Sequence, residues 1–499
     1  MFKATSRLQG RKRDVFINAK DMEFYAKFLT LALAVMWSAV FVRGAELSPT
    51  ADSRTLASEL CAVMDFDFPE NFAISRAVAQ EIESRAAKGD FDANAALGVC
   101  YYAGLNFPKD RQKAVEKFTV AAFGGSEFGM WGLGLSMIEG SGVAVNEKSG
   151  VGFLRKSAAK NFAPAINQLG VCYYRGIGVG RNFPKAVELF RRAEALGSNR
   201  AKVALARAFL EGAGVEKNPL EARRLLEEAA KAGNVVAQNN LAVFFLEGID
   251  GKTDEFAAVR WLEAAAKNKY PSSMLLLGMA YMQGNGVPQD VARGFLLIKG
   301  AAELGNHEAQ NNLAVCYTNG YGVEANSALA FKWYETAAIS GYAIAQNNLG
   351  DCYFNGVGCK EDKYEAVRWY RRAAFQGDVS AQSNLGYCYL EGIGIGKSAA
   401  DAIKWLKKAA DKGDVSAQSN LGTCYVNSVG TAQNIPEAIK YLTLAADKGD
   451  PQAMGNLGAC YYNGIGVEKN ELKGTDLLRK AAKGGNEEAR KALNRIVGR

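Results

Sequence analysis

The sequence predicts an all-α fold, a right-handed superhelical α/α solenoid of helix-loop-helix repeats, each 36 residues long. The first observation is a leucine that recurs every 36 residues without insertion or deletion. The second is a glycine loop and an alanine-marked segment that follow in the same phase. The third is a composition of 48% apolar and 22% charged residues, which is normal for a folded chain. A fixed period of roughly 20–50 residues is typical of solenoids. The leucines are Leu97, Leu133, Leu169, Leu205, Leu241, Leu277, Leu313, Leu349, Leu385, Leu421, Leu457 and Leu493.

The first helix of each repeat, here called the A helix, is predicted by the residues around this leucine. Ala345 lies four residues before Leu349, and Tyr353 lies four residues after it. Spacings of four place all three side chains on one face of a helix. Positions along the A helix are counted from the small residue, so that Ala345 is position zero and Leu349 is position four.

The second helix, here called the B helix, follows a glycine loop such as GYGV at 320–323. Glycine supplies the positive φ that ends one helix and turns the chain sharply. The B helix starts near a small residue such as Ala366 and carries a large apolar residue, here Tyr370, four positions later. It closes with an alanine pair and a glycine stop at Gly377. We therefore expect about twelve helix pairs of one design.

Three loops depart from this pattern. Asn106 stands where other repeats have the second loop glycine, and segments 248–251 and 428–431 have the sequences GIDG and SVGT. We expect altered loops at these points within an unchanged fold.

Seven cysteines share position seven of the A helix. At 100° per residue this position lies about 20° from the alanine, on the buried face. Neighbouring repeats should be about 8–10 Å apart, whereas a disulfide needs Cα atoms within about 7 Å. We therefore predict buried free thiols, with some pairing as the alternative. Cys359 lies in a loop, and no third or fourth metal ligand accompanies it and Cys352. The seven are Cys100, Cys172, Cys316, Cys352, Cys388, Cys424 and Cys460.

The repeat closely resembles the Sel-one-like repeat, a 36-residue relative of the tetratricopeptide repeat. The segments that carry the resemblance include ALGVCYYAGL, QLGVCYYRGIGV, NLAVCYTNGYGV and NLGDCYFNGVGC. The resemblance covers residues 92 to 499 almost completely. It implies a scaffold or adaptor for protein complexes. Some exported, cysteine-rich bacterial members are linked to β-lactam or cell-wall-peptide binding, which is the alternative function that the resemblance implies.

The N-terminus resembles a targeting segment. Phe28–Val42 is free of charge over fifteen residues, which as a helix would span about 22 Å, short of the roughly 30 Å hydrocarbon core of a membrane. Small residues at Val42 and Gly44 precede a cut before Ala45. We predict a signal peptide at 1–44, with an uncut membrane anchor as the alternative and Met22 as an alternative start. The mature protein is then exported, periplasmic or extracellular, from a bacterial source.

The remaining chain divides into three parts. Residues 45–91 are expected to form an N-terminal cap, in which Ile74–Gly89 resembles a lone B helix. Residues 92–485 hold eleven repeats. Residues 486–499 are charged and are expected to form a C-terminal capping helix.

Charge distribution argues against nucleic-acid binding. Residues 1–44 hold eight Lys and Arg against three acids, whereas the remainder holds 52 against 49 without a basic stripe. The predicted partner is instead a protein or an extended peptide, with membrane contact only if the signal segment is uncut.

Catalytic motifs are absent or accounted for by the repeat. His307 is the only histidine, which excludes two-histidine zinc sites. Ser157 and Lys160 fit the Ser-x-x-Lys pattern of penicillin-recognising enzymes, but they overlap the alanine pair of a B helix. Segment 392–398 ends like a phosphate loop but lacks the first glycine and follows a helix. The sequence therefore predicts no enzymatic activity, no cofactor and no metal.

A partner surface is predicted on the concave face of the solenoid, at positions two and six of the A helices, which point about 200° and 240° from the alanine and away from the core. Position two is a polar ladder, and position six varies while its neighbours repeat. The alternative is a solvated face without a partner. Asparagines at position three are expected to satisfy backbone groups between repeats. Tryptophans 261, 333, 369 and 405 share one B-helix position, with packing favoured over ligand stacking. The candidate binding residues are Asn239, Val243, Met279, Asn311, Val315, Asn347, Asp351, Ser383, Tyr387, Ser419 and Thr423.

Overall fold

The computed structural model describes residues 48–64 and 74–497. Within these residues every regular element is an α-helix, and there is no strand. None of the described helices is both long enough and apolar enough to cross a membrane. The predicted signal segment Phe28–Val42 and the alternative start Met22 lie outside the described residues.

The helices follow the predicted period, and α4 to α25 each span 13 residues. α2 (Ser53–Met64) comes before the repeats. The A helices are α4 (Phe91–Ala103), α6 (Glu127–Glu139), α8 (Ala163–Arg175), α10 (Asn199–Glu211), α12 (Val235–Glu247), α14 (Pro271–Gln283), α16 (His307–Asn319), α18 (Ala343–Asn355), α20 (Val379–Glu391), α22 (Val415–Asn427), α24 (Pro451–Asn463) and α26 (Glu487–Val497). The B helices are α3 (Arg76–Ala87), α5 (Arg111–Phe123), α7 (Glu147–Ala159), α9 (Phe183–Ala195), α11 (Pro219–Lys231), α13 (Glu255–Lys267), α15 (Val291–Glu303), α17 (Ser327–Ile339), α19 (Lys363–Phe375), α21 (Ala399–Asp411), α23 (Ile435–Asp447) and α25 (Glu471–Lys483).

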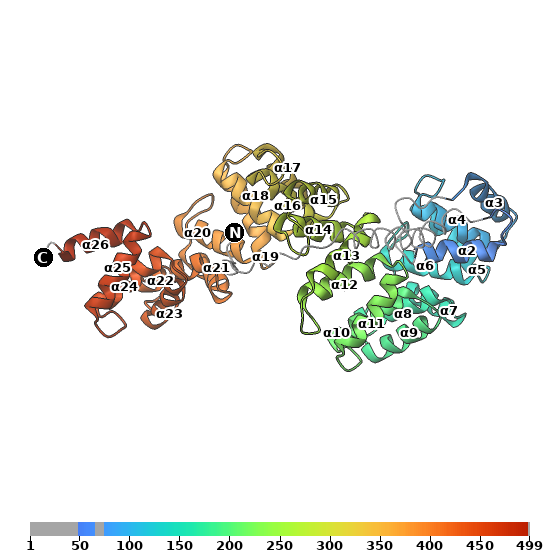
Figure 1. Cartoon of the computed structure of the whole chain (residues 1–499), viewed down its shortest axis with the longest axis horizontal. Helices are drawn as coiled ribbons and strands as arrows, with labels where there is room; N and C mark the ends of the chain where they lie inside the picture. The colour runs from blue at the N-terminus through green and yellow to red at the C-terminus, as the bar shows by residue number, and fades with distance from the viewer. Residues whose placement is uncertain (1–47, 65–73, 498–499) are drawn as a thin grey trace, which may run out of the picture. The chain divides into compact units, whose positions relative to one another are not determined.

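These helices form two compact units. The N-terminal unit, residues 1–254, contains α2 to α12, and the C-terminal unit, residues 255–499, contains α13 to α26. Within each unit the helices pack in chain order, which the blue-to-red colouring of Figure 1 traces. From α4 onward, each A helix packs on the B helix before it or after it wherever that helix belongs to the same unit. The expected all-α solenoid of paired helices is therefore confirmed within each unit.

Local sequence chemistry sets where each helix begins and ends. α18 ends at Gly356, whose φ of 67° lies in the left-handed region and whose N–H donates to the Cys352 carbonyl. α19 begins after Asp362, whose carboxylate accepts from two backbone N–H groups of the first turn. Between them, a Cβ on Gly358 would lie 2.1 Å from the carbonyl oxygen of Ser327 in α17. The loop glycines are thus needed for the turn and for close approach of the neighbouring repeat.

The altered loops keep the turn without glycine. Asn106 has a φ of 55° and Ser428 a φ of 56°, both in the left-handed region. The expectation of local change within the same fold is confirmed at these two loops.

Position zero and position four form the core of each repeat. Ala345 and Leu349 are fully buried, as are their equivalents Ala381 and Leu385. The seven thiols at position seven are also buried, and none of them forms a disulfide. Burial raises the pKa of Cys352 to about 12. The predicted buried free thiols are thereby confirmed at position seven.

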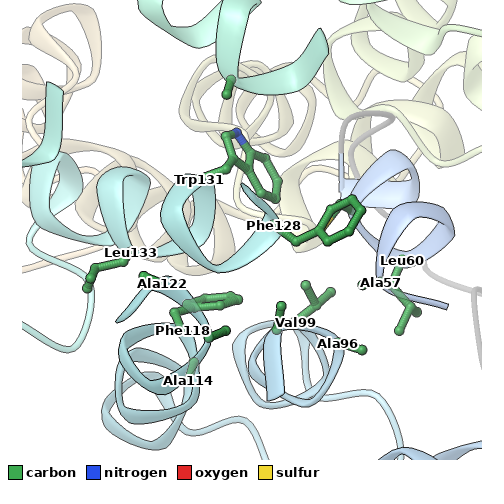
Figure 2. Close-up of a cluster of buried hydrophobic side chains, with 14 of the residues drawn as sticks. Ala57, Leu60, Ala96, Val99, Ala114, Phe118, Ala122, Phe128, Trp131 and Leu133 are labelled. Atoms are coloured by element: carbon green, nitrogen blue, oxygen red, sulfur yellow. The ribbon is translucent and has the colours of Figure 1, made fainter. Parts of the chain in front are cut away.

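The first helix of the N-terminal unit has a different placement. α2 packs mainly on α4, with a smaller contact to α6. Its buried face consists of Leu56, Ala57, Leu60 and Cys61. Figure 2 shows Ala57 and Leu60 beside Ala96 and Val99 of α4.

Polar contacts fix the start of this helix. The Ser53 hydroxyl donates to Oδ2 of Asp90 at 2.7 Å, and Asp90 caps α4. Arg54 forms an ion pair with the buried Glu127 at the start of α6. Apolar burial and these polar contacts together hold α2 on the two A helices.

Candidate functional site

Position six is accessible on α12 of the N-terminal unit and on A helices of the C-terminal unit. Tyr387 is 41% exposed, and the other predicted residues of this position are half-buried. They stand on α12, α14, α16, α18 and α22 as Val243, Met279, Val315, Asp351 and Thr423. The partner-binding role of these residues stays a prediction.

Position two was expected to face away from the core, and this expectation of exposure is wrong. The structure buries all five residues, because position two faces the next A helix of the array. Oγ of Ser383 donates to Oδ1 of Asp414 at 2.8 Å, and Asp414 caps α22. Position two therefore joins successive repeats. The five residues are Asn239, Asn311, Asn347, Ser383 and Ser419.

Two asparagines of position three, Asn348 and Asn384, link repeats through side chains, whereas they were expected to satisfy backbone groups between repeats. Asn312 instead donates to the Glu308 carbonyl of its own helix. Nδ2 of Asn348 donates to Oδ1 of Asn311 at 2.9 Å. Nδ2 of Asn384 donates to Oδ1 of Asn347 at 3.0 Å. Each bond joins position three of one A helix to position two of the helix before it. The result is an amide ladder along α16, α18 and α20.

A glutamine at position one has a structural role that the sequence analysis missed. Nε2 of Gln346 donates to the Ala338 carbonyl at the end of α17, at 3.1 Å. This bond adds a side-chain donor to a helix-end carbonyl that also accepts from the Gly341 N–H at 3.0 Å. This structural role could have been predicted from the sequence, because the glutamine recurs at position one of the A helix. The same bond is made by Gln238, Gln310, Gln382 and Gln418.

Asp351 is the acidic residue of position six and is held by neutral donors. The Tyr370 hydroxyl donates to Oδ1 at 2.7 Å, and Nδ2 of Asn384 donates to the same oxygen at 3.3 Å. Nδ2 of Asn347 donates to Oδ2 at 3.2 Å. Burial raises the pKa of Asp351, and the negative charge of Asp378 raises it further. Sequence spacing did not reveal that Tyr370 and Asn384 hold this carboxylate.

On α4 of the N-terminal unit, the equivalent face is covered by α2. Val99, the position-six residue of α4, is fully buried, and so is Ala96 at position three. In the C-terminal unit position three is an asparagine on every A helix from α16 to α24. Small apolar residues thus replace polar ones where α2 lies against α4.

The B-helix tryptophans pack between repeats. Trp405 is buried, and its ring centroid lies 5.2 Å from that of Phe375 in an edge-to-face arrangement. The Arg372 guanidinium lies 4.4 Å from the centroid of Trp369. Trp333 packs against two neighbouring clusters of buried apolar side chains, one that includes Phe295 and one that includes Tyr334. The packing role is confirmed at these three positions.

The Ser-x-x-Lys pattern has a structural role. Ser157 is fully buried, and its hydroxyl donates to the Glu127 carbonyl at 2.7 Å. Nζ of Lys160 bonds to the Gly125 carbonyl. Both bonds join α7 to the start of α6. Across the described residues, no group of three or more His, Cys, Asp and Glu side chains is arranged to hold a metal ion.

Comparison with known proteins agrees with this architecture. The Sel1 repeat family matches eleven times, at residues 91–116, 128–162, 163–198, 200–234, 235–270, 271–306, 307–342, 343–378, 379–414, 415–450 and 451–486. Similar solved structures include c5321, a protective antigen of uropathogenic Escherichia coli with the SLR fold. It is 29% identical, with a TM-score of 0.55, over 84% of this chain and 90% of that one. A Sel1 repeat protein from Oxalobacter formigenes is 29% identical over 62% of this chain and 90% of that one, with a TM-score of 0.47.

No curated protein matches this sequence. The repeat matches nevertheless run through most of the chain, and they coincide with the helix pairs of the structure. With its period, its helix pairs and its matches in agreement, the chain belongs to the Sel1-repeat family, whose solenoids are typically protein-interaction scaffolds.

Proposed function

We propose that this protein is an exported, non-enzymatic scaffold that holds a partner protein or an extended peptide on its C-terminal unit. The binding surface is the A-helix face, defined by the position-six residues of that unit. Contacts along several repeats would add up, so that no cofactor is needed. These residues are Met279, Val315, Asp351, Tyr387 and Thr423.

The observation that carries the proposal is the placement of α2. In the N-terminal unit this amphipathic helix lies on α4 and buries Val99 at position six. The face is therefore able to take a polypeptide segment through apolar contact. In the C-terminal unit Tyr387 at the same position is 41% exposed.

Variation along the face supports the same proposal. The residues that build the core are the same from repeat to repeat, because packing requires them. Position six changes from Val315 to Asp351 to Tyr387 in three successive repeats. A surface whose chemistry changes along its length suits recognition of one particular sequence of side chains.

The test is co-purification with the C-terminally tagged chain from its native cell. We expect a protein partner to elute with the unchanged chain and to be lost from the Asp351→Asn/Tyr387→Ala double variant. Asp447→Asn is the matched control, since it removes one exposed acid at the end of α23. Retention of the partner by the double variant would show that this face is the wrong one.

The export part of the proposal has a separate test. Small residues precede Ala45 at the positions that signal peptidase requires. The mature protein is expected to begin at Ala45 and to be found outside the cytoplasm. N-terminal sequencing that finds Met1 or Met22 on the functional protein would contradict cleavage.

A further inference from the structure

Asp351 has no cationic partner, unlike the shielded acids Glu127 and Asp250. Glu127 is paired with Arg54 and lies 3.6 Å from Nζ of Lys160. Asp250 is paired with Arg223 at 2.7 Å. For Asp351, no lysine or arginine in the described part of the chain is within ion-pair distance. Its charge is balanced only by the dipoles of a hydroxyl and two amides.

The ammonium of Lys363, at the start of the following B helix, is engaged by other groups. Lys363 contacts the carbonyl oxygen of Phe354, near the end of α18, and lies 3.4 Å from Glu361. Its ammonium also lies 3.9 Å from the ring centroid of Phe354. Lys363 is thus fixed by other partners and leaves Asp351 uncompensated.

An uncompensated carboxylate in a partly desolvated position is costly for the folded state. Removal of a charge from water costs free energy that only a counter-charge or a full set of donors returns. The negative Asp378 adds repulsion, as its effect on the pKa of Asp351 indicates. A cation from outside the chain would relieve both effects.

Tyr387 supplies a second element of cation recognition. It occupies position six of α20, one repeat after Asp351, so the two residues are about 8–10 Å apart along the face. Its ring is 41% exposed. In the part of the chain that the structure describes, it makes no hydrogen bond and no ring contact. An exposed tyrosine ring next to a carboxylate attracts an ammonium or guanidinium group.

We propose that Asp351 and Tyr387 form a subsite for one lysine or arginine side chain of the bound protein or peptide. The carboxylate pairs with the cationic head, and the tyrosine ring packs on its apolar stem or its charged face. Tyr370, Asn347 and Asn384 hold the carboxylate in place. The inference rests on the proposed function, since it names the chemistry of the partner at one point of the A-helix face.

The test is selection of twelve-residue peptides from a random phage-displayed library on the full-length protein. We expect the selected peptides to be enriched in lysine or arginine at one position. The best peptide, made synthetically, should bind Asp351→Asn about tenfold more weakly, since a charge-assisted hydrogen bond is lost. Tyr387→Ala should also weaken binding, whereas Asp447→Asn should leave it unchanged.

A change on the peptide provides a test that does not depend on the folding of a variant. Acetylation of the selected lysine, or replacement of a selected arginine by citrulline, removes the positive charge and keeps the length. Affinity for the unchanged protein should then fall by a similar factor. If the neutral peptide binds as tightly as the charged one, the cation subsite is wrong.

The outcomes separate this inference from the proposed function. Peptides that bind the A-helix face without basic enrichment, and bind Asp351→Asn equally well, would overturn the subsite and leave the scaffold standing. A library that yields no binding peptide would count against peptide recognition itself and against the subsite with it.

Discussion

Single residues of this solenoid divide into those that build the repeat and those that depart from it. Leu349 and Cys352 recur at fixed positions and are buried. Asp351 lies between them in sequence, yet it stands at a position where other repeats carry valine, methionine or threonine. One residue of rotation on a helix is therefore enough to separate a core side chain from a surface one.

The first residue-scale prediction concerns pH. Because burial raises the pKa of Asp351, the folded protein holds its proton more tightly than the unfolded chain. The contribution of this group to stability is therefore fully present below the unfolded pKa and is lost as pH rises through the folded pKa. The urea midpoint of Asp351→Asn, minus that of the unchanged protein, should increase between pH 4 and pH 7. A difference that stays constant with pH would contradict the shift.

A second residue-scale prediction concerns the thiols. Burial raises the pKa of Cys388 to about 11 and that of Cys352 to about 12. Since the thiolate is the reactive form, iodoacetamide at pH 8 should leave both unmodified in the folded protein. The half-buried Cys359 should react before them, and urea should expose all three. Peptide mass mapping checks this order, and rapid labelling of Cys388 without urea would refute it.

At the scale of helices, much of the structure could be predicted from the period. The A and B helices follow from one pattern of small, leucine and glycine residues without insertions. The placement of α2 could not be predicted this way, because it lies outside the period. The sequence indicated this placement only indirectly, since Ala96 and Val99 of α4 are apolar at positions that are polar or variable in other repeats.

The burial of position two was missed for a different reason. A helical wheel gives direction relative to one helix axis and contains no information about the neighbouring repeat. Ser383 points away from its own core and into the contact with α22. The Asp351 network was missed likewise, since Tyr370 comes from the B helix and Asn384 from the next repeat.

The contact of α2 leads to an element-scale prediction. Leu60 is fully buried, and Leu60→Ala should destabilise the N-terminal unit by about 2–5 kcal/mol, as a cavity-forming truncation. Hydrogen exchange in α4 should increase, because the cover of Val99 is loosened. Glu59→Ala, on the exposed side of α2, is the control and should have little effect. Equal effects of the two changes would argue that α2 does not pack through this face.

The altered loop after α22 leads to a second element-scale prediction. Ser428 has a φ of 56°, a conformation that costs a residue with a Cβ roughly 1–2 kcal/mol. Ser428→Gly should therefore stabilise the C-terminal unit, by about 1 kcal/mol or somewhat more. Gly392→Ser, at the equivalent point after α20 with a φ of 76°, should destabilise it. Thermal unfolding of both variants measures the effects, and shifts of the same sign would contradict this account.

At the scale of the whole molecule, each helix contacts helices that lie near it in chain order within its unit, and A helices of successive repeats also touch at several points. Stability in such an array is approximately a sum of repeat terms and nearest-neighbour terms. The amide ladder and the glutamine bonds belong to the neighbour terms, since they join consecutive repeats.

A core truncation tests this locality. Leu385 is fully buried, and Leu385→Ala should cost about 2–5 kcal/mol. Hydrogen exchange should rise in α18 to α22 and stay unchanged in α4 to α8. A uniform rise over all helices would mean that the array unfolds as a single cooperative body.

The most direct test of the central claim is site-specific photo-crosslinking in the native cell. A photoreactive amino acid is placed at Val315 or Thr423 on the A-helix face, and at Lys404 on the exposed side of α21. We expect the same partner to be cross-linked from Val315 and Thr423, and little product from Lys404. Cross-linking to that partner mainly from Lys404 would contradict the account and move the binding surface to the B helices.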